Sequence, residues 1–170
     1  MKLVRPTKKY EKQWHEAINE FKKDSRSIKI WEILGFPEDL EEIINNAQLC
    51  SQGKNLSKGW VPYDIYWLID DNKFIGIANI RHKLNDNLLK GGGHIGYEII
   101  PSKRKLGYGN QILRLSLEKI KKLGIKKVLV TSFDKNIASW KIIEKNGGRL
   151  ENKVKIKSEK GLTRRYWINL

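Results

Sequence analysis

A strand, a short basic loop and a long helix follow one another in the second half of the chain, and this order constrains the fold most. Residues 94–100 are mostly apolar or aromatic and stop at Pro101, which predicts a strand. Residues 107–123 carry apolar side chains at helical spacing, and Gly124 follows them as a helix stop. Residues 127–133 are almost continuously apolar, as in a strand inside a sheet. Such a unit predicts a crossover that returns the chain to the same sheet.

The remaining segments predict further strands and helices around this unit. Apolar and β-branched runs indicate strands, and apolar residues three and four apart indicate helices. The order β-α-α-β-β-β-α-β-α-β-β predicts an α/β (α+β) fold: one mixed, twisted sheet of about seven strands with helices on both faces. The other strands are expected at 3–5, 63–69, 74–81, 150–157 and 162–170, and the other helices after Pro6, from Pro37 and at 136–145, with a loop at 85–92.

Length and composition limit the class of protein. A chain of 170 residues with 39% hydrophobic residues can bury a full core, so we expect a single domain over residues 1–170. No apolar run approaches the roughly 20 residues of a membrane span, and the N-terminus lacks a signal-peptide pattern. We therefore expect a cytoplasmic protein without a membrane partner. The single cysteine, Cys50, excludes an intrachain disulfide.

Positive charge is concentrated in the second half of the chain. The net charge is +15, and residues 86–170 carry 20 of the 34 Lys and Arg residues but only 7 of the 19 Asp and Glu residues. A basic surface of this kind is compatible with nucleic acid, an anionic membrane surface or a polyphosphate ligand. It is equally compatible with an ordinary solvated surface rich in lysine, so charge alone does not select a partner.

The loop between the strand and the long helix is a predicted site for a pyrophosphate. The first turn of a helix has unpaired backbone N–H groups and the positive end of the helix dipole, which bind oxyanions. Gly107 and Gly109 let the backbone approach a phosphate, and Arg104 adds positive charge. The dinucleotide fingerprint is excluded because it needs three glycines and a later acidic residue, and a P-loop because no Gly-Lys-Ser/Thr follows.

The same loop carries a resemblance to a known family. Arg104-x-x-Gly107-x-Gly109 after a strand resembles the acyl-CoA signature of the GNAT superfamily of N-acetyltransferases, R/Q-x-x-G-x-G/A. Residues 92–101, directly before it, resemble a subgroup of small bacterial acetyltransferases. A lone R-x-x-G-x-G occurs often by chance, so the neighbouring segments decide the weight of the match.

The downstream segment is similar to the second motif of the same family. A strand at 128–133 is followed by Asn136-x-x-Ser139 opening a helix, and Gly147 lies eleven residues after Asn136. The close resemblance covers residues 92–148, and the order of elements agrees over the whole chain. The chain is thereby identified as resembling a GNAT N-acetyltransferase.

The resemblance implies acetyl-CoA as acyl donor and a set of donor-binding residues. Backbone groups of Glu98–Ile100 would pair with the pantetheine arm where the fourth and fifth strands splay apart, and N–H groups of Lys105–Asn110 would hold the pyrophosphate. Asn136 would bond the pantetheine; alternatively, Asn136 and Ser139 only cap a helix. The expected donor-binding residues are Ile99, Ile100, Arg104, Lys105, Leu106, Gly107, Tyr108, Gly109, Asn110, Asn136 and Ser139.

Acyl transfer to an amine needs a base that removes the amine proton. Glu98 is the predicted base because it lies on the strand beside the expected thioester; the alternative is a structural carboxylate paired with a Lys or Arg. His82 and His94 are alternative bases. No His, Cys, Asp and Glu cluster has the spacing of a metal site, so no metal is expected.

The acid that protonates the leaving thiolate departs from the family pattern. The resemblance places a tyrosine seven residues after the motif's asparagine, and here that position is Ile143. Tyr108 is the predicted substitute, with Tyr97 and Ser139 as alternatives. Because the thiolate can also leave without an acid, the sequence leaves this proton transfer open.

The expected activity is acetyl transfer to a primary amine of a small molecule, by direct attack in a ternary complex. Acetylation of a protein or peptide amine, for instance on the ribosome, and a non-catalytic CoA- or RNA-binding module are the alternatives. Glu38, Asp39, Glu41 and Glu42 would suit a cationic amine, or they serve only the helix dipole. We do not expect nucleic acid as a partner. A homodimer is compatible with the sequence, which leaves the oligomeric state open.

Overall fold

The strands of the protein form two hydrogen-bonded sheets. The structure is a computed structural model that describes residues 1–24, 39–156 and 161–170. Within these residues, one sheet has the order β1-β2-β3-β4, the other the order β5-β7-β6, and all paired strands are antiparallel. The strands are β1 (Lys2–Val4), β2 (Tyr63–Asp70), β3 (Lys73–Arg81), β4 (Ile95–Ile99), β5 (Lys127–Phe133), β6 (Arg149–Lys155) and β7 (Leu162–Asn169).

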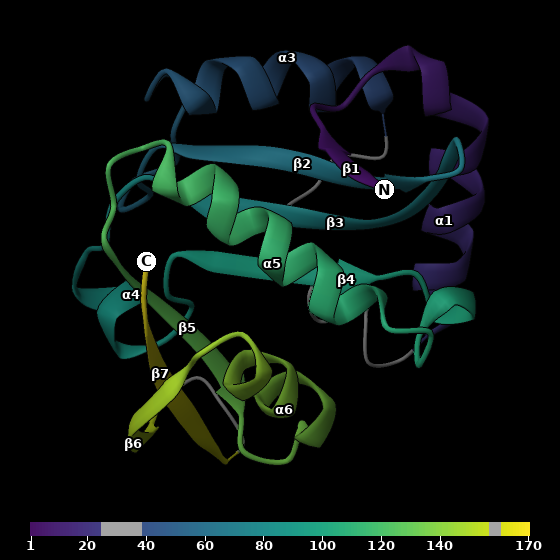
Figure 1. The fold of residues 1–170 in the computed structure, drawn as a ribbon. Coiled ribbons are helices and arrows are strands. Elements are labelled where there is room, and N and C mark those ends of the chain that lie inside the picture. Colours follow the sequence, from purple (N-terminus) through teal and green to yellow (C-terminus); the bar gives the residue numbers. More distant parts are fainter. Residues whose placement is uncertain (25–38, 157–160) are drawn as a thin grey trace.

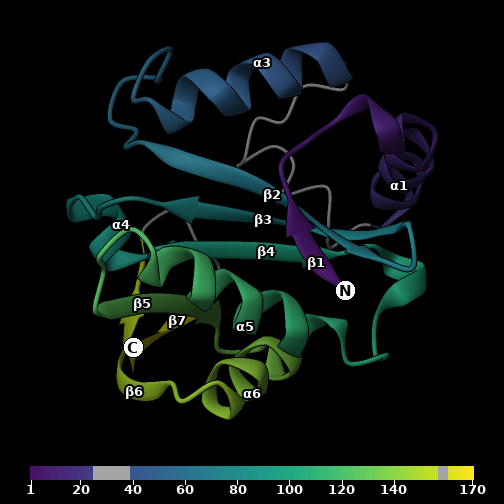
Figure 2. The ribbon, with the colours of Figure 1, turned by 45° about the horizontal axis from the view of Figure 1, so that its top comes forward.

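Helices cover both faces of the first sheet, as the sequence predicts. They are α1 (Glu11–Lys23), α3 (Leu40–Ser51), α4 (Asp86–Lys90), α5 (Tyr108–Lys121) and α6 (Ile137–Lys145), with the 3₁₀ turns η1 (Lys8–Tyr10) and η2 (Pro101–Lys103). Figures 1 and 2 place α1 and α3 on one face of this sheet and α5 on the other, with α6 beside α5 and against the second sheet. The α+β class and the helices on both faces are therefore confirmed.

The alternation of side chains along β2 explains why both faces are covered. Trp67 is fully buried toward α1, where its ring stacks on Trp14 with 5.1 Å between centroids. Its neighbour Leu68 points to the opposite face and joins the cluster that contains Ile112 and Leu113 of α5. A strand that is apolar on both faces must be buried on both, which places this sheet in the middle layer.

Side-chain caps set the starts of the shorter helices. Asp39 caps α3 by accepting from the Glu42 N–H at 3.0 Å, while the predicted start at Pro37 lies outside the described residues. The loop expected at 85–92 was wrong in part, because it contains α4. Asn85 accepts from the Leu88 N–H at 3.0 Å and thereby caps this short helix.

The strands form two sheets where one mixed sheet was expected, because β4 and β5 separate, as the family resemblance implies for the fourth and fifth strands. At their starts the His94 N–H donates to the Leu129 carbonyl at 2.7 Å, and the Leu129 N–H donates to His94 Nδ1 at 2.9 Å. Beyond this point no ladder joins β4 to β5 within the described residues, and the strands diverge in Figure 1. We call this divergence the splay, with its closed end at His94 and its open end at Ile99 and Phe133.

Strand β6 forms the outer edge of the second sheet. It pairs with β7 along one side only, within the residues that the structure describes. Six of its seven residues are exposed, with Val154 half-buried. It therefore contributes little to the core, which the second sheet builds from the apolar residues of β5 and from Tyr166 and Ile168 of β7.

Candidate active site

The donor loop, residues 105–109, presents a row of backbone N–H groups at the start of α5. Lys105 and Gly107 have positive φ angles of 63° and 85°, so the backbone is left-handed on both sides of Leu106. Within the described part of the chain, no protein acceptor takes the N–H groups of residues 105–109. Such a concave run of N–H groups at a helix N-terminus binds phosphate oxygens. The loop therefore fits a pyrophosphate.

The two glycines of the motif occupy different surroundings. A Cβ at Gly107 would meet no atom within 4 Å, so space does not require a glycine here. The left-handed backbone does, and the open space lets a phosphate approach. A Cβ at Gly109 would lie 2.6 Å from Ile142 Cδ1 of α6, a contact that rotation of the Ile142 side chain can relieve. Asn110 is already engaged, because its N–H donates to the Gly107 carbonyl at 3.1 Å. The N–H groups open to an anion thus end at Gly109.

The outer edge of β4 is open along the splay. The Ile100 N–H donates to the Ile75 carbonyl of β3 at 3.1 Å, whereas the Ile99 carbonyl points to the other side and accepts from Arg104 Nε at 3.1 Å. Backbone groups of successive strand residues alternate between the two edges, so Tyr97 shares the orientation of Ile99. Of the residues expected to pair with pantetheine, Ile99 is the one whose backbone faces this edge, and because Arg104 holds its carbonyl, its N–H is the group that faces the splay.

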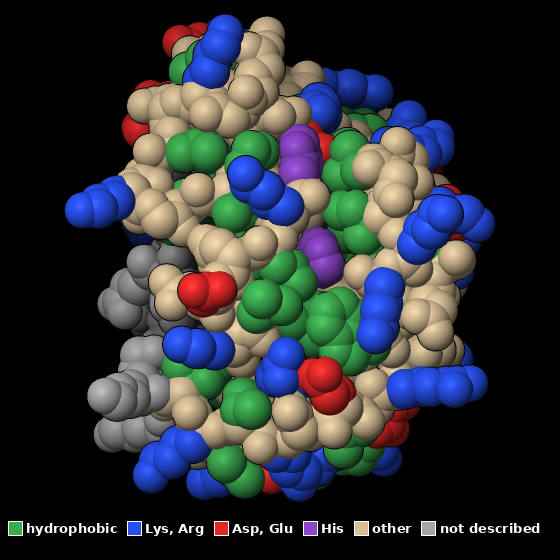
Figure 3. Space-filling model, turned by 90° about the vertical axis from the view of Figure 1, so that its left-hand side faces the viewer, with side chains coloured by type: hydrophobic (Ala, Val, Ile, Leu, Met, Phe, Trp, Pro, Cys, Tyr) green, Lys and Arg blue, Asp and Glu red, His purple; other side chains and the backbone are tan. Residues whose placement is uncertain are grey.

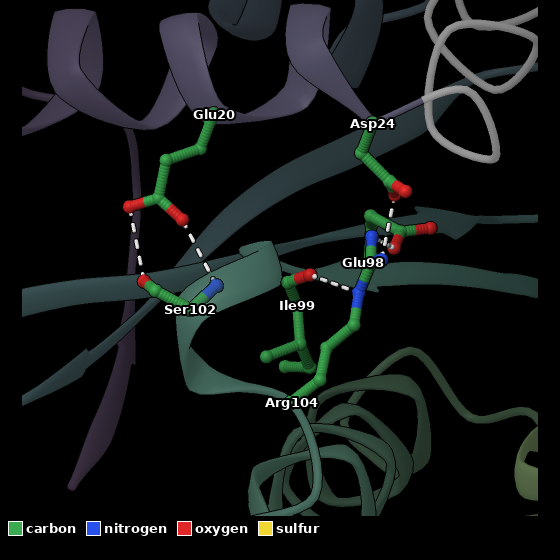
Figure 4. A network of polar contacts seen from close by, with 6 residues as sticks. All are labelled: Glu20, Asp24, Glu98, Ile99, Ser102 and Arg104. Atoms are coloured by element: carbon green, nitrogen blue, oxygen red, sulfur yellow. Dashed lines mark hydrogen bonds and ion pairs between the residues drawn. The ribbon is translucent and has the colours of Figure 1, made fainter.

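Arg104 makes protein contacts with all three of its nitrogens. Besides Nε on Ile99, one terminal nitrogen lies 2.6 Å from Asp24 Oδ2 and the other 2.7 Å from Glu98 Oε1. Figure 4 shows the guanidinium between the end of α1 and β4, with Asp24 above it. The signature arginine is thus brought to Glu98, and its side chain is only 21% exposed.

Glu98 lies at the open end of the splay, on the face that α1 covers. It pairs in register with Ile77, whose side chain belongs to the cluster around α1. Its carboxylate accepts from Arg104, so the contact expected of a structural carboxylate is present. A carboxylate that accepts a hydrogen bond can still exchange a proton with a substrate amine, so this contact and a role as base are compatible. The role of Glu98 as a base stays a prediction.

The structure does not bring Tyr108 to Glu98. Tyr108 belongs to the face of α5, and its hydroxyl donates to Asp70 Oδ2 at 3.0 Å near the end of β2. That hydrogen bond is the main cause that raises the pKa of the Tyr108 phenol. Its role as an acid stays a prediction.

Tyr97 and Ser139 meet across the splay. The Tyr97 hydroxyl lies 3.4 Å from Ser139 Oγ, which links β4 to the start of α6. Burial raises the pKa of Tyr97 to about 12, and the charge of Glu98 adds to this effect while Ser139 opposes it. The phenol therefore keeps its proton at neutral pH, as an acid must before it donates.

The second motif forms as the capping interpretation expects. Asn136 Oδ1 accepts from the Ser139 N–H at 3.2 Å, which is an N-cap of α6. Ile143, in the place of the family's tyrosine, is fully buried in the α5 core cluster. An isoleucine side chain has no proton to donate, so position 143 cannot supply the acid in this protein.

The two candidate histidines lie at the wrong end of the splay for a base. His94 is buried, and burial, with a further effect from Arg81, lowers its pKa to about 4. Four residues separate it from Glu98, or about 13 Å along a strand. Its ring holds the closed end together through Leu129 rather than facing the open end.

His82 also lies beyond the closed end. Its Nε2 is 3.1 Å from Asp64 Oδ2, and Arg5 contacts the other oxygen of the same carboxylate at 2.8 Å. Burial alone would raise the pKa of Asp64, but Ser51, Arg5 and His82 together lower it. In Figure 3, which views this end, histidine atoms lie in a hollow among hydrophobic side chains with Lys and Arg around it.

A comparison with protein families decides the identity of the chain. The model described as an acetyltransferase (GNAT) domain matches residues 4–149. The chain belongs to the GNAT acetyltransferase family. Acetyl-CoA is therefore its acyl donor, which agrees with the pyrophosphate-binding geometry of residues 105–109 and the open edge of β4.

Solved GNAT structures share the whole fold at low identity. An acetyltransferase from Salmonella typhimurium that modifies the N-terminal serine of a 50S ribosomal subunit protein is 16% identical, with a TM-score of 0.65 over 99% of this chain and 94% of that one. The microcin self-immunity acetyltransferase MccE, in complex with acetyl-CoA and AMP, is 16% identical, with a TM-score of 0.69 over 99% and 91%. A GNAT-family enzyme from Bacillus anthracis is 22% identical, with a TM-score of 0.65 over 99% and 95%.

Other comparisons add limits rather than a substrate. No curated protein matches the sequence at a significant level. None of the helices among the described residues is long and apolar enough to cross a membrane.

Sequence reasoning missed Asp24, because its partner Arg104 is 80 residues away and no local pattern links them.

Proposed function

We propose that this GNAT enzyme acetylates a primary amine by direct attack on acetyl-CoA in a ternary complex. The observation that carries the proposal is the proximity of three features: the open N–H groups of residues 105–109, the open edge of β4 at Ile99, and the carboxylate of Glu98. Residues 1–170 would serve as one catalytic domain. The first feature suits the pyrophosphate, the second the pantetheine arm, and the third the incoming amine.

In the proposed reaction the neutral amine nitrogen attacks the thioester carbonyl carbon and the C–S bond breaks. Glu98, directly or through a water, takes the proton that the amine loses. Backbone N–H groups along the open edge, those of Tyr97 and Ile99, are oriented to stabilise the oxyanion of the tetrahedral intermediate. Holding both substrates at one edge supplies much of the rate by itself.

For the thiolate we propose Tyr97 as the acid ahead of Tyr108. Tyr97 precedes Glu98 on β4, but its side chain points to the opposite face of the sheet, where its hydroxyl meets Ser139 at the start of α6 along the splay. Tyr108 is engaged with Asp70, near the end of β2. A phenol that keeps its proton can donate to the departing sulfur.

The acceptor we propose first is the amine of a small molecule. Among the solved structures with the same fold is MccE, whose complex also contains AMP. The acidic residues at the start of α3 do not add support for a cationic acceptor, because Asp39 caps the helix and Glu41 pairs with Lys8. Glu38 lies outside the described residues.

The N-terminal amine of a ribosomal protein is the second candidate acceptor. It is favoured by the similarity, over 99% of this chain, to structures described as acetyltransferases of ribosomal proteins. Both acceptor classes need the same donor site and the same base, so the two candidates differ only in what approaches the open end of the splay.

The test is thiol release from acetyl-CoA in the presence of a broad panel of amines, peptides and ribosomes. The proposal expects acceptor-dependent release of CoA and a mass increase of one acetyl group on the acceptor. Saturable CoA binding with no turnover on any acceptor class would instead indicate a non-catalytic CoA-binding module. RNA binding without CoA binding would indicate the nucleic-acid alternative.

A further inference from the structure

The end of α1 is tied to the donor strand through one guanidinium. Asp24 follows the last residue of α1, and its carboxylate lies 2.6 Å from a terminal nitrogen of Arg104. The other terminal nitrogen contacts Glu98, and Nε contacts the carbonyl of Ile99 (Figure 4). A planar guanidinium that meets three acceptors at once is fixed in orientation, and it fixes its partners in turn.

We propose that Asp24 and Arg104 are positioning residues, which orient Glu98 and the open edge of β4, and that Arg104 is not a ligand of the pyrophosphate. Asp24 holds the guanidinium from the α1 side. Arg104 then holds the Glu98 carboxylate beside the edge on which the thioester lies. The inference rests on the proposed function, because it assigns a purpose to the orientation of the proposed base.

The geometry of the loop supports this division of tasks. The backbone N–H groups of residues 105–109 are open to an anion, so the pyrophosphate has donors without the guanidinium. Arg104 directs three of its five N–H donors at Ile99, Asp24 and Glu98, so a phosphate that drew the guanidinium toward the loop would compete with two carboxylates for it. Moving the guanidinium away from two half-buried carboxylates, 16% and 15% exposed, would be costly because they share it as a cation.

A second contact from the same helix provides a matched control. Glu20, one turn before Asp24, accepts from the Ser102 N–H at 2.9 Å and from its hydroxyl at 3.0 Å (Figure 4). It ties α1 to the same connection between β4 and α5, but it contacts neither Arg104 nor Glu98 in these bonds. Loss of Glu20 therefore tests docking of α1 alone, and loss of Asp24 tests docking together with the orientation of Glu98.

The experiment compares Asp24→Asn, Glu20→Gln and Arg104→Gln with two donors, acetyl-CoA and acetyl-pantetheine, which lacks the nucleotide and the pyrophosphate. We expect Asp24→Asn to lower kcat about 10-fold with either donor, since small misplacement of a catalytic group has effects of this order. Its dissociation constant for acetyl-CoA should stay within about twofold of wild type. Glu20→Gln should leave kcat nearly unchanged.

Arg104→Gln decides between the two roles of the arginine. A positioning residue predicts the same fold loss of kcat with both donors, with Arg104→Lys recovering part of it. A phosphate ligand predicts weaker binding of acetyl-CoA and no effect with acetyl-pantetheine, and that result would overturn the inference. So would equal effects of Asp24→Asn and Glu20→Gln, which would reduce Asp24 to a docking contact.

A variant at the base itself separates failure of this inference from failure of the proposed function. If Glu98→Gln leaves turnover unchanged, the proposed base is wrong, and Asp24 has no base to position. If Glu98→Gln is inactive while Asp24→Asn matches wild type with both donors, the base stands and the positioning role is refuted. Melting temperatures of all variants show which losses come from the fold.

Discussion

The two ends of the splay differ in how they are held. At the closed end, backbone and buried groups bind one another: His94 joins Leu129 through two hydrogen bonds, and Arg81 donates to the carbonyls of Gly92 and Gly93 at 3.1 Å. At the open end, partly exposed side chains from four elements meet around β4. Their residues are Asp24, Tyr97, Glu98, Arg104 and Ser139.

This difference explains which titratable groups are available for chemistry. The closed end must keep two strands in contact, so its histidine is buried, hydrogen-bonded and deprotonated. The open end has no ladder to maintain, so its backbone and carboxylate can meet a substrate. A histidine is the residue most often considered as a base, but the position of His94 at the closed end gives it a structural role.

The largest effect is expected at the open end. Glu98→Gln should lower kcat by about 10²- to 10⁴-fold, because loss of a general base has effects of this size. Acetyl-CoA affinity, measured by calorimetry, should change little, since the carboxylate is proposed to act on the amine. An equal loss in His94→Phe, at matched folded fraction, would reverse the comparison between the two ends.

The closed end should instead control stability and its dependence on pH. The pKa of His94, about 4, lies below the usual 6.5, so between these pH values the imidazole binds a proton in the unfolded chain but not in the folded protein. Stability is therefore present above about pH 6.5 and falls as the pH drops toward 4, by about 3 kcal/mol at most for this group. Urea unfolding followed by tryptophan fluorescence across this range measures the loss.

His94→Phe should remove that pH dependence and, at neutral pH, cost about 1–3 kcal/mol, because the Leu129 N–H loses its acceptor. The exposed His15 serves as the control, and His15→Gln should keep the wild-type profile. A pH profile of stability that His94→Phe leaves unaltered would show that another group governs acid unfolding.

The two ends of α5 offer a matched pair of glycines. Gly107 and Gly124 have φ angles of 85° and 78°, and a Cβ at either meets no atom within 4 Å. Alanine at each should cost about 1–2 kcal/mol of stability for a left-handed residue. Only Gly107→Ala should weaken acetyl-CoA binding, by about 10-fold, since it strains the donor loop. Equal acetyl-CoA affinities of the two variants would argue against the loop as the pyrophosphate site.

The smallest effect is expected for the acid, because a CoA thiolate can leave without help. Tyr97→Phe should lower kcat by about 10-fold or less, and Tyr108→Phe should have a smaller effect on kcat. Steady-state thiol release with a good acceptor measures both. If Tyr108→Phe has the larger effect on kcat at equal stability, the acid belongs to the α5 face and Tyr97 only packs against α6.

Local patterns in the sequence predicted the elements well, and contacts between distant segments poorly. Residues 127–133 form β5 with the predicted bounds, because a continuous apolar run between turn residues has few other solutions. The cap of α6 at Asn136 also follows from local chemistry. Asn85 carries the same capping signal for α4, but a helix of five residues shows too little periodicity to be recognised.

The sequence could not predict which distant residues the long side chains contact. Arg104 was expected to add charge beside a phosphate, and its partner Asp24 is 80 residues away. The break between β4 and β5 was implied by the family resemblance alone, because the composition of either strand gives no guide to it. The contact of Arg104 with Asp24 arises only when the chain is folded.

The exposed edge of β6 has a consequence for behaviour in concentrated solution. An unpaired strand edge is a template on which a second chain can add its own strand and begin to aggregate. Within seven residues β6 carries Arg149, Lys153 and Lys155, so two copies brought edge to edge would set like charges against each other. Part of the surplus of lysine and arginine thus protects this edge, and neutralising the three residues should lower solubility before it lowers activity.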